Sequence, residues 1–333
     1  MTSPRPEPLD PAALRLAADV RRFGHNTLAK DEAGKRLWVP VRHGVVMHAA
    51  KWGRLTPEQR HAAFVHATAL RMKDDSPVVF SHTSAAAVCG LPRVSAWPTR
   101  VEVTNTGTVV RSSGLIRRHH LPLHATIEIG GLCVTSVART VLDLARTEEL
   151  HDAVAAADHA LHHKLCTKVE LEAEFDHLES GVSGRARARL VLDFADPKSM
   201  SVGESLSRVQ MFRLNLPRPE LQVRVEDEEG LAGVCDFGWK GRRVMGEFDG
   251  RKKYGILVGM DPKEIERAVW NEKRREDRIR AADHKMARWI WADAIRPSQM
   301  ARILAAQGIR PEAKNTWFAN DVGVRHPRRP DAA

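Results

Sequence analysis

Residues 231–249 read LAGVCDFGWKGRRVMGEFD, and this stretch decides the fold expected for the C-terminal part of the chain. Two runs of mostly apolar residues flank Lys240-Gly241, which is typical of a two-residue hairpin turn. Such a turn pairs Trp239 with Arg242. We therefore expect two antiparallel strands, over about 231–239 and 242–249.

Alternation of side chains along these strands predicts where their carboxylates lie. Asp236, Glu247 and Asp249 fall on one side of the hairpin, and an apolar set falls on the other: Cys235, Phe237, Trp239, Val244 and Phe248. Gathered carboxylates repel one another, and Mg²⁺ (or Mn²⁺) is a counter-charge that oxygen ligands bind and that supports phosphoryl chemistry. The alternative is a solvated face on which the acids pair with Arg243, Arg251 or Lys252.

The segments around the hairpin extend this pattern. A helix over about 202–214 carries Glu204, and a strand over 221–226 follows it. After the hairpin, Asp261-Pro262 is typical of a helix start, an N-cap followed by proline, and that helix runs to about residue 282. A last strand covers 285–291. The expected order is helix, three strands, helix, strand, written αβββαβ.

Four motifs in this segment resemble one family: Asp236-Phe-Gly-Trp, Gly246-Glu-Phe-Asp-Gly250, Glu272-Lys-Arg-Arg-Glu-Asp277 and Arg288-Trp-Ile-Trp291. They are similar to the restriction-endonuclease-like domains related to very-short-patch repair (Vsr) endonucleases, within the PD-(D/E)xK superfamily. The resemblance implies an αβββαβ core in which Asp236 and Glu247 hold the metal, with Glu204 as the acid on the first helix. Asp249 stands where the motif has lysine, so Lys253 or Lys273 would have to replace that lysine.

Two upstream stretches resemble AbiEi-type antitoxin proteins. They are Ser81-His-Thr-Ser-Ala-Ala-Ala-Val-Cys-Gly-Leu-Pro92 and Thr135-Ser-Val-Ala-Arg-Thr-Val-Leu-Asp-Leu144. The resemblance implies a regulator with an N-terminal winged helix, DNA as a partner and a cognate toxin as a second partner. From the residues alone, His82 is either a functional group or a capping or packing residue, and the second role is favoured.

The first 50 residues favour helices followed by a basic hairpin. We expect helices over Pro11–Phe23 and Leu28–Arg36 and two short strands within 37–47. This is the order of a winged helix-turn-helix, in which one helix enters the major groove. Arg36, Arg42 and His43 would then contact DNA. The alternative is a small helical cap with a hairpin.

The chain as a whole is predicted to be a multi-domain α+β protein. The expected parts are a winged-helix-like region (1–55), an AbiEi-like α/β domain (56–195), the nuclease-like domain (200–300) and a basic C-terminal tail (301–333). A helix beginning at Thr56-Pro57 opens the second part. His159, His162 and His163 crowd one helix of this part, where we expect a polar face rather than a metal site.

Charge supports a nucleic-acid partner. The 333 residues have a formal net charge of +10. Residues 1–100 carry 15 basic and 8 acidic side chains, whereas residues 101–200 carry 11 and 14. No apolar run approaches the roughly 18 residues that span a bilayer, the N-terminus lacks a signal pattern, and the four cysteines are widely spaced. These features predict a cytoplasmic protein with no membrane association.

Two functions remain open at this point. The first is a Mg²⁺-dependent DNA endonuclease, in which Arg274, Arg275 and Arg278 of the long helix would track phosphates. The alternative for these arginines, which their spacing favours, is pairing with the acids of the same helix: Glu272, Glu276 and Asp277. The second is an AbiEi-like antitoxin and transcriptional regulator whose nuclease-like domain is catalytically inactive. Both predict DNA binding, so cleavage is the property that separates them.

Overall fold

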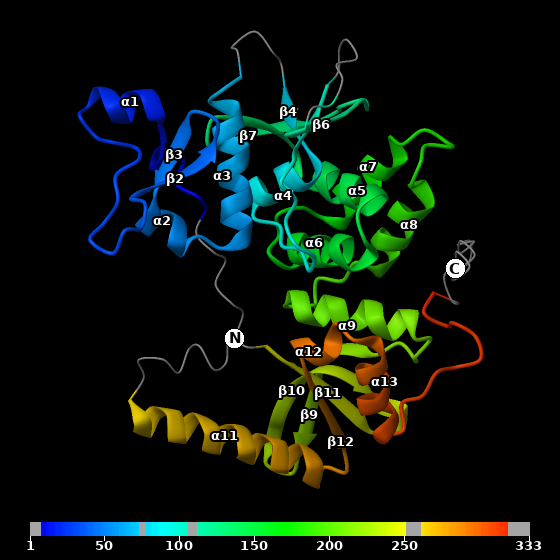
Figure 1. Cartoon of the computed structure of the whole chain (residues 1–333). Coiled ribbons are helices and arrows are strands. Elements are labelled where there is room, and N and C mark those ends of the chain that lie inside the picture. The colour runs from blue at the N-terminus through cyan, green and yellow to red at the C-terminus, as the bar shows by residue number, and fades with distance from the viewer. Residues whose placement is uncertain (1–7, 73–77, 106–111, 113, 251–260, 319–333) are drawn as a thin grey trace. The chain divides into compact units, whose positions relative to one another are not determined.

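The chain divides into two units, Met1–Leu192 and Asp193–Ala333. The computed structural model describes residues 8–72, 78–105, 112, 114–250 and 261–318. Both units combine helices with sheets (Figure 1), which confirms a multi-part α+β protein. The expected boundaries at 55/56 and 300/301 stay predictions.

The N-terminal segment contains a small three-stranded sheet. Its strands are β1 (Leu14–Leu16), β2 (Trp38–Arg42) and β3 (Val45–His48), in the order β1-β3-β2. The predicted basic hairpin is therefore present, with its tip at Arg42-His43-Gly44. Gly44 has a φ of 75°, a value that glycine adopts without steric cost.

The predicted helices of this segment are largely wrong. Pro11–Phe23 is split into a 3₁₀ turn (η1, Pro11–Ala13), β1 and the six-residue helix α1 (Ala17–Arg22). Residues 28–36 form turns, because the side chains of Asn26 and Asp31 accept the backbone N–H groups of Leu28 and Lys35 and so compete with helical bonds. The expected groove-entering helix is therefore absent from this described stretch, and a winged helix is not confirmed.

Helices α2 (Ala49–Arg54) and α3 (Pro57–Ala69) follow the hairpin. Helix α3 begins as predicted, and Thr56 and Gln59 cap it reciprocally. Ala63 and Ala67 of α3 pack in one hydrophobic cluster with Leu14, Val45 and Met47 of the small sheet. The small sheet is thereby joined to the helix that precedes the central domain.

A five-stranded mixed sheet forms the centre of the first unit. Its strands are β4 (Val79–Phe80), β5 (Val101–Thr104), β6 (Ile116–His119), β7 (Thr126–Ile129) and β8 (Leu132–Thr135), in the order β6-β5-β4-β8-β7. Five helices accompany it: α4 (His82–Cys89), α5 (Val137–Thr147), α6 (Leu150–His162), α7 (Lys168–Asp176) and α8 (Arg185–Phe194). Helix α4 starts directly after the central strand β4, so its first residues lie in the core.

The second unit has the predicted αβββαβ order. It runs through α9 (Val202–Arg213), β9 (Glu220–Asp227), β10 (Gly230–Trp239), β11 (Val244–Asp249), α11 (Pro262–Ala281) and β12 (Lys285–Ile290). The sheet order is β12-β11-β10-β9, with β12 parallel to β11 and the other pairs antiparallel. Helices α12 (Trp291–Ala294) and α13 (Pro297–Ala306) follow. Beyond them, the Trp317 indole donates to the carbonyl of Leu216 over 2.7 Å.

The predicted two-residue turn at 240–241 is wrong. Lys240–Arg242 form a 3₁₀ turn (η2), Arg243 has a φ of 51°, and Trp239 pairs with Val244 rather than Arg242. Each residue of β10 therefore pairs with a residue of β11 two positions later than predicted. Because side chains alternate with a period of two, the side chains of β11 keep the predicted faces.

Helices cover both faces of this sheet. On one face, Gly203 of α9 lies so close to Phe248 that a Cβ atom there would overlap the phenyl ring. On the other face, Ile279 of α11 packs with Cys235 and Met245. Cys235 was predicted on the opposite side from Met245, but both pack in one cluster, because alternation along β10 is interrupted at Asp236, which has no registered pair on either neighbouring strand. The predicted acidic face is thus covered by a helix.

Candidate functional site

Three predicted carboxylates lie near one another where β10 and β11 run side by side. Asp236 accepts the backbone N–H of Phe248 over 2.9 Å, and Phe248 stands between Glu247 and Asp249. Arg288 of β12 links the other two acids, because its Nε lies 3.1 Å from Glu247 and 3.7 Å from Asp249. The sequence-based expectation that these acids gather agrees with this geometry.

Both carboxylate oxygens of Glu247, which is only 5% exposed, are held by arginines. Oε1 lies 2.6 Å from Nη2 of Arg275, and Oε2 accepts from Arg288. Burial alone would lower the pKa of these two arginines, but hydrogen bonds and charges from Glu247 and Glu272 outweigh it and raise the pKa of both. Both arginines therefore stay charged and neutralise the cluster.

This arrangement does not fit a divalent cation. A Mg²⁺ or Mn²⁺ ion needs the carboxylate oxygens that the guanidinium groups already occupy. Within the described ranges, no group of three or more histidine, cysteine, aspartate or glutamate side chains is placed to hold a metal. Ion pairing, the alternative weighed from the sequence, is observed, but with Arg275 and Arg288; Arg243 instead pairs with Asp283.

The remaining predicted residues of the nuclease-like site lie in three different settings. Glu204 is buried and caps its own helix α9: it accepts from the N–H of Met200 (2.9 Å) and the hydroxyl of Ser201 (2.7 Å). Lys273 is exposed on α11. Lys253 lies outside the described residues, so its predicted role stays a prediction.

The residues predicted to contact DNA in the N-terminal segment differ in exposure. Arg36 and His43 are exposed. Arg42 points inward: it donates to the carbonyl of Thr99 over 2.9 Å and lies 4.9 Å from the ring centre of Phe64. Burial lowers the pKa of Arg42. Its guanidinium therefore joins elements of the first unit.

The predicted DNA-contacting arginines of α11 also differ. Arg274 is exposed. Arg275 is committed to Glu247 and Glu272, and Arg278 donates from Nε to Asp227 of β9 over 2.7 Å. Two of the three arginines therefore attach the helix to the sheet.

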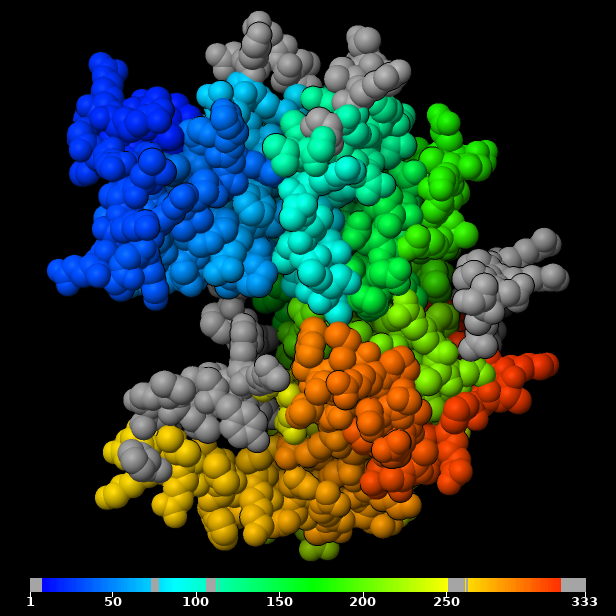
Figure 2. All heavy atoms as spheres, in the orientation of Figure 1, coloured from blue at the N-terminus to red at the C-terminus, as the bar shows by residue number. Residues whose placement is uncertain are grey.

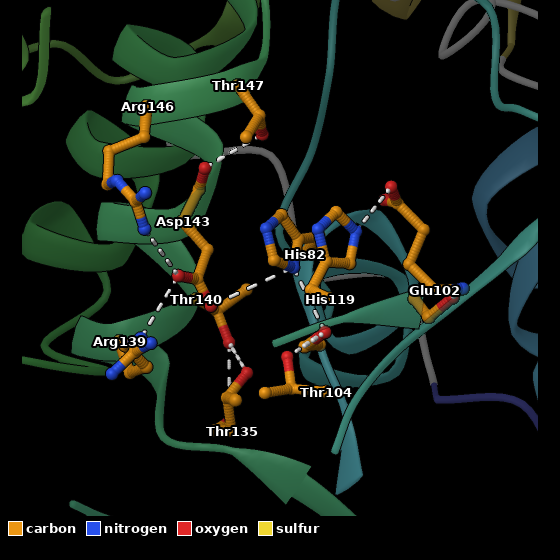
Figure 3. Close-up of polar contacts among 12 residues, drawn as sticks. His82, Glu102, Thr104, His119, Thr135, Arg139, Thr140, Asp143, Arg146 and Thr147 are labelled. Atoms are coloured by element: carbon orange, nitrogen blue, oxygen red, sulfur yellow. Dashed lines mark hydrogen bonds and ion pairs between the residues drawn. The ribbon is translucent and has the colours of Figure 1, made fainter. Parts of the chain in front are cut away.

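A second polar cluster, which the sequence analysis did not predict, lies inside the first unit (Figure 3). The rings of His82 and His119 stack with centroids 3.6 Å apart. Each ring faces a carboxylate: Nε2 of His119 lies 3.2 Å from Glu102, and Nδ1 of His82 lies 3.9 Å from Asp143. We call these four residues the imidazole–carboxylate cluster.

Further polar groups surround this cluster. Thr83 donates to Glu102 from both its backbone N–H (3.0 Å) and its hydroxyl (2.6 Å). Arg139 donates to Asp143 over 3.0 Å, one helical turn along α5. Asp143 is fully buried and Arg139 is 3% exposed. The contacts of Thr83 fix α4 to strand β5 inside the core, whereas the Arg139–Asp143 contact lies within α5.

The cluster is unsuited to nucleophilic catalysis. Ser81 and Asp143 both face Nδ1 of His82, whereas a catalytic triad needs the acid and the nucleophile on different ring nitrogens. Ser81 and His82 are also completely buried. Burial lowers the pKa of His82 to about 4, and although burial acts to raise it, bonds from His119 and Thr83 lower the pKa of Glu102 to about 2. The His82 ring is therefore neutral at neutral pH, and the Glu102 carboxylate is ionised.

One backbone feature marks this place. His82, the first residue of α4, has a φ of 50°. Residues other than glycine, asparagine and aspartate rarely adopt this backbone conformation. The surrounding contacts must hold this conformation. A sequence signal existed for one pair alone, since Arg139 and Asp143 are four residues apart on a predicted helix.

The cluster lies in the part of the chain that matches a known family. Residues 80–194 match the model of the AbiEi antitoxin C-terminal domain, which confirms the expected resemblance of the central part. The match does not extend to residues 195–333, so the endonuclease-like tail is not confirmed.

Uncharacterized proteins from two strains of Mycobacterium tuberculosis, CDC 1551 / Oshkosh and H37Rv, are each 32% identical over 121 residues. That is 36% of this chain and 44% of each relative, so the chain spans less than half the length of these relatives. No solved structure matches. Helices in the described part of the chain are all too short or too polar to cross a membrane.

Proposed function

We propose that this chain is a DNA-binding regulator of the antitoxin type, which acts with a cognate toxin. The observation that carries the proposal is the match of residues 80–194 to an antitoxin domain. In that region polar groups are buried and mutually bonded, which is what a rigid binding scaffold requires.

DNA binding is assigned to the N-terminal segment. Residues 1–100 hold 15 of the basic side chains against 8 acidic ones, and Arg36 and His43 are exposed beside the β2–β3 hairpin. Such an excess attracts phosphate without reading sequence. The C-terminal unit serves as a scaffold in this proposal, since arginines neutralise Glu247.

A mobility-shift assay tests the DNA-binding half of the proposal. The full chain should shift duplex DNA from upstream of its own gene, and affinity should fall with salt. Arg36→Ala should reduce the salt slope by roughly one, and Arg36→Ala/His43→Ala should weaken binding further. Lys168→Ala, an exposed charge on α7, is the matched control. A chain that binds no DNA rules the proposal out.

Co-expression tests the toxin-binding half. A toxin encoded beside this chain's gene should arrest growth when expressed alone, and the full chain should restore growth. A pull-down of the two purified proteins should recover them together. Arrest that persists in the presence of folded chain would contradict an antitoxin role.

A metal-dependent DNA endonuclease is the second candidate. The gathering of Asp236, Glu247 and Asp249 favours it, and the predicted αβββαβ order is consistent with it. These acids would hold Mg²⁺ or Mn²⁺, with Lys253 or Lys273 beside it, but only after Arg288 and Arg275 had withdrawn. The arginine contacts are why we place this candidate second.

Plasmid cleavage separates the two candidates. A nuclease should nick or cut plasmid with Mg²⁺ or Mn²⁺, and Asp236→Ala and Glu247→Ala should abolish the activity. Glu228→Ala, an exposed acid in the β9–β10 turn, should cleave normally. Wild-type protein that shifts DNA but leaves plasmid intact with both metals excludes the nuclease and leaves the regulator.

A further inference from the structure

Helix α11 presents an exposed tryptophan on the face turned away from the sheet. Trp270 is 59% exposed, whereas Ile279, nine residues later, is fully buried under the sheet. Nine residues make two and a half turns of helix, so the two side chains point in opposite directions. A single exposed apolar side chain is ordinary and needs no partner, so the charged residues around the indole decide what this face can bind.

The helix itself is firmly attached at its C-terminal half. Arg275 contacts Glu247, Arg278 contacts Asp227, and Ile279 packs in the core of the unit. The N-terminal half of α11 extends past the sheet, and the helix forms an exposed ridge of this unit (Figures 1 and 2). Trp270 is thus held on a rigid element that projects into solvent.

Mostly basic side chains surround Trp270. The residues three and four positions away are Glu266, Arg267, Lys273 and Arg274, and all four are exposed. Three cations and one acid therefore lie within one turn of the indole. We call Arg267, Trp270, Lys273 and Arg274 the α11 outer face.

From this combination we propose that the α11 outer face binds single-stranded nucleic acid. The indole would stack on an unpaired base, and the three flanking cations would contact the phosphates on either side. Stacking on aromatic side chains within a basic surface is the general way in which proteins hold single strands without reading their sequence. A paired base inside a duplex offers no free face for this contact.

A protein partner fits the α11 outer face less well. The buried centre of protein interfaces is depleted in charged residues, whereas every neighbour of Trp270 at this spacing is charged. Phosphate is the partner that three adjacent cations complement. The inference goes beyond the proposed function, which assigns duplex binding to the N-terminal segment, so each can fail without the other.

Fluorescence anisotropy of labelled oligonucleotides tests the inference on the full chain. Oligothymidylate and oligouridylate of about twenty nucleotides serve as probes, and a duplex of equal length serves for comparison. Trp270→Ala should weaken binding of the single strands about tenfold, and Trp270→Phe should retain most of it. Replacing Arg267, Lys273 and Arg274 together with alanine should flatten the salt dependence.

Two controls isolate the α11 outer face. Val269→Ala changes the neighbouring residue, which is equally exposed at 60% but points elsewhere, and Arg302→Ala removes an exposed charge from α13. Both should bind single strands like the wild type. DNA and RNA probes distinguish the two sources of the strand, and binding of either supports the inference.

The inference is overturned if the wild type binds neither single strand. It is also overturned if Trp270→Ala binds both strands normally, or if Trp270→Ala abolishes self-association while strand binding is unchanged. An unchanged urea-unfolding midpoint for the second unit shows that the Trp270→Ala variant is folded.

Discussion

Both polar clusters of this chain stabilise buried carboxylates, but with different partners. In the first unit, the imidazole–carboxylate cluster is almost completely buried, and imidazole rings, a hydroxyl and arginines surround its two acids. In the second unit, Glu247 is buried but its partners Arg275 and Arg288 are 23% and 28% exposed. The difference teaches that arginines compensate the buried acid of the second unit, whereas the first unit buries histidine rings such as His82, whose pKa burial lowers, so the two units should respond differently to protons.

Acid should separate the two units most clearly. Burial lowers the pKa of His61, His66 and His82 to about 4, below the value near 6.5 of an unfolded histidine. The unfolded chain therefore binds more protons between these values, and stability is lost as pH falls from about 6.5 to 4. Each histidine contributes at most roughly 3 kcal/mol.

Hydrogen exchange across this pH range measures the effect by region. Amides of β4, β5 and α5 should lose protection, while those of β10 and β11 should change little. In His82→Gln the loss should shrink by about a third, as one of the three lowered histidines is gone. Glu102, with its pKa near 2, stabilises at pH 4.5 and above and loses its effect below that. Equal loss in both units would break the comparison.

Removing the central acid of the first cluster should come next in size. Asp143→Asn takes from Arg139, which is 3% exposed, its carboxylate partner at 3.0 Å and leaves only Glu174 at 3.9 Å. Breaking a buried ion pair in this way costs roughly 3 kcal/mol. Urea unfolding followed through the first unit measures the cost. Asp176→Asn, an exposed acid on α7, should be nearly neutral by comparison.

Removing one arginine of the second cluster should cost less. Arg288→Met takes one of two guanidinium groups from Glu247, and Arg275 remains in contact. We expect a loss of about 2 kcal/mol in urea unfolding, since one charge still compensates the buried acid. If Arg288→Met proves as damaging as Asp143→Asn, Arg275 does not share the charge as its geometry indicates.

The smallest effect should come from an exposed pair on the same helix as Arg275. Arg280 donates to Glu276 and is 51% exposed. Arg280→Met should change the free energy of unfolding by less than about 0.5 kcal/mol. A larger loss would indicate that Glu276, which also contacts Arg288, belongs to the second cluster energetically.

The sequence predicted the second unit better than the first because local signals specify it. Alternating residues and the Asp261-Pro262 helix start were enough to give αβββαβ and to gather Asp236, Glu247 and Asp249, although the turn predicted at 240–241 was wrong. The partners of Glu247 were not predictable, because Arg288 comes from a strand 41 residues later and no local pattern records that contact. We predicted a metal ion because the sequence pattern indicated the acids but not the arginines that neutralise them.

Failures in the first unit have similar causes. The helix predicted over 28–36 is absent because the side chains of Asn26 and Asp31 accept backbone N–H groups of nearby turn residues. The imidazole–carboxylate cluster takes His82, Glu102, His119 and Asp143 from four separate elements, and its two acids are of a type that is mostly exposed. The resemblance to AbiEi antitoxins located the region without revealing that its polar residues are internal.

The close contact between Gly203 and Phe248 limits where the acids of the second unit can lie. Phe248 stands between Glu247 and Asp249, so the missing side chain at position 203 sets how far the end of β11 can lie from α9. Any larger residue at 203 would displace both carboxylates together, without altering a single charge. The geometry of the acids is thus controlled by an uncharged position on the opposite face of the sheet.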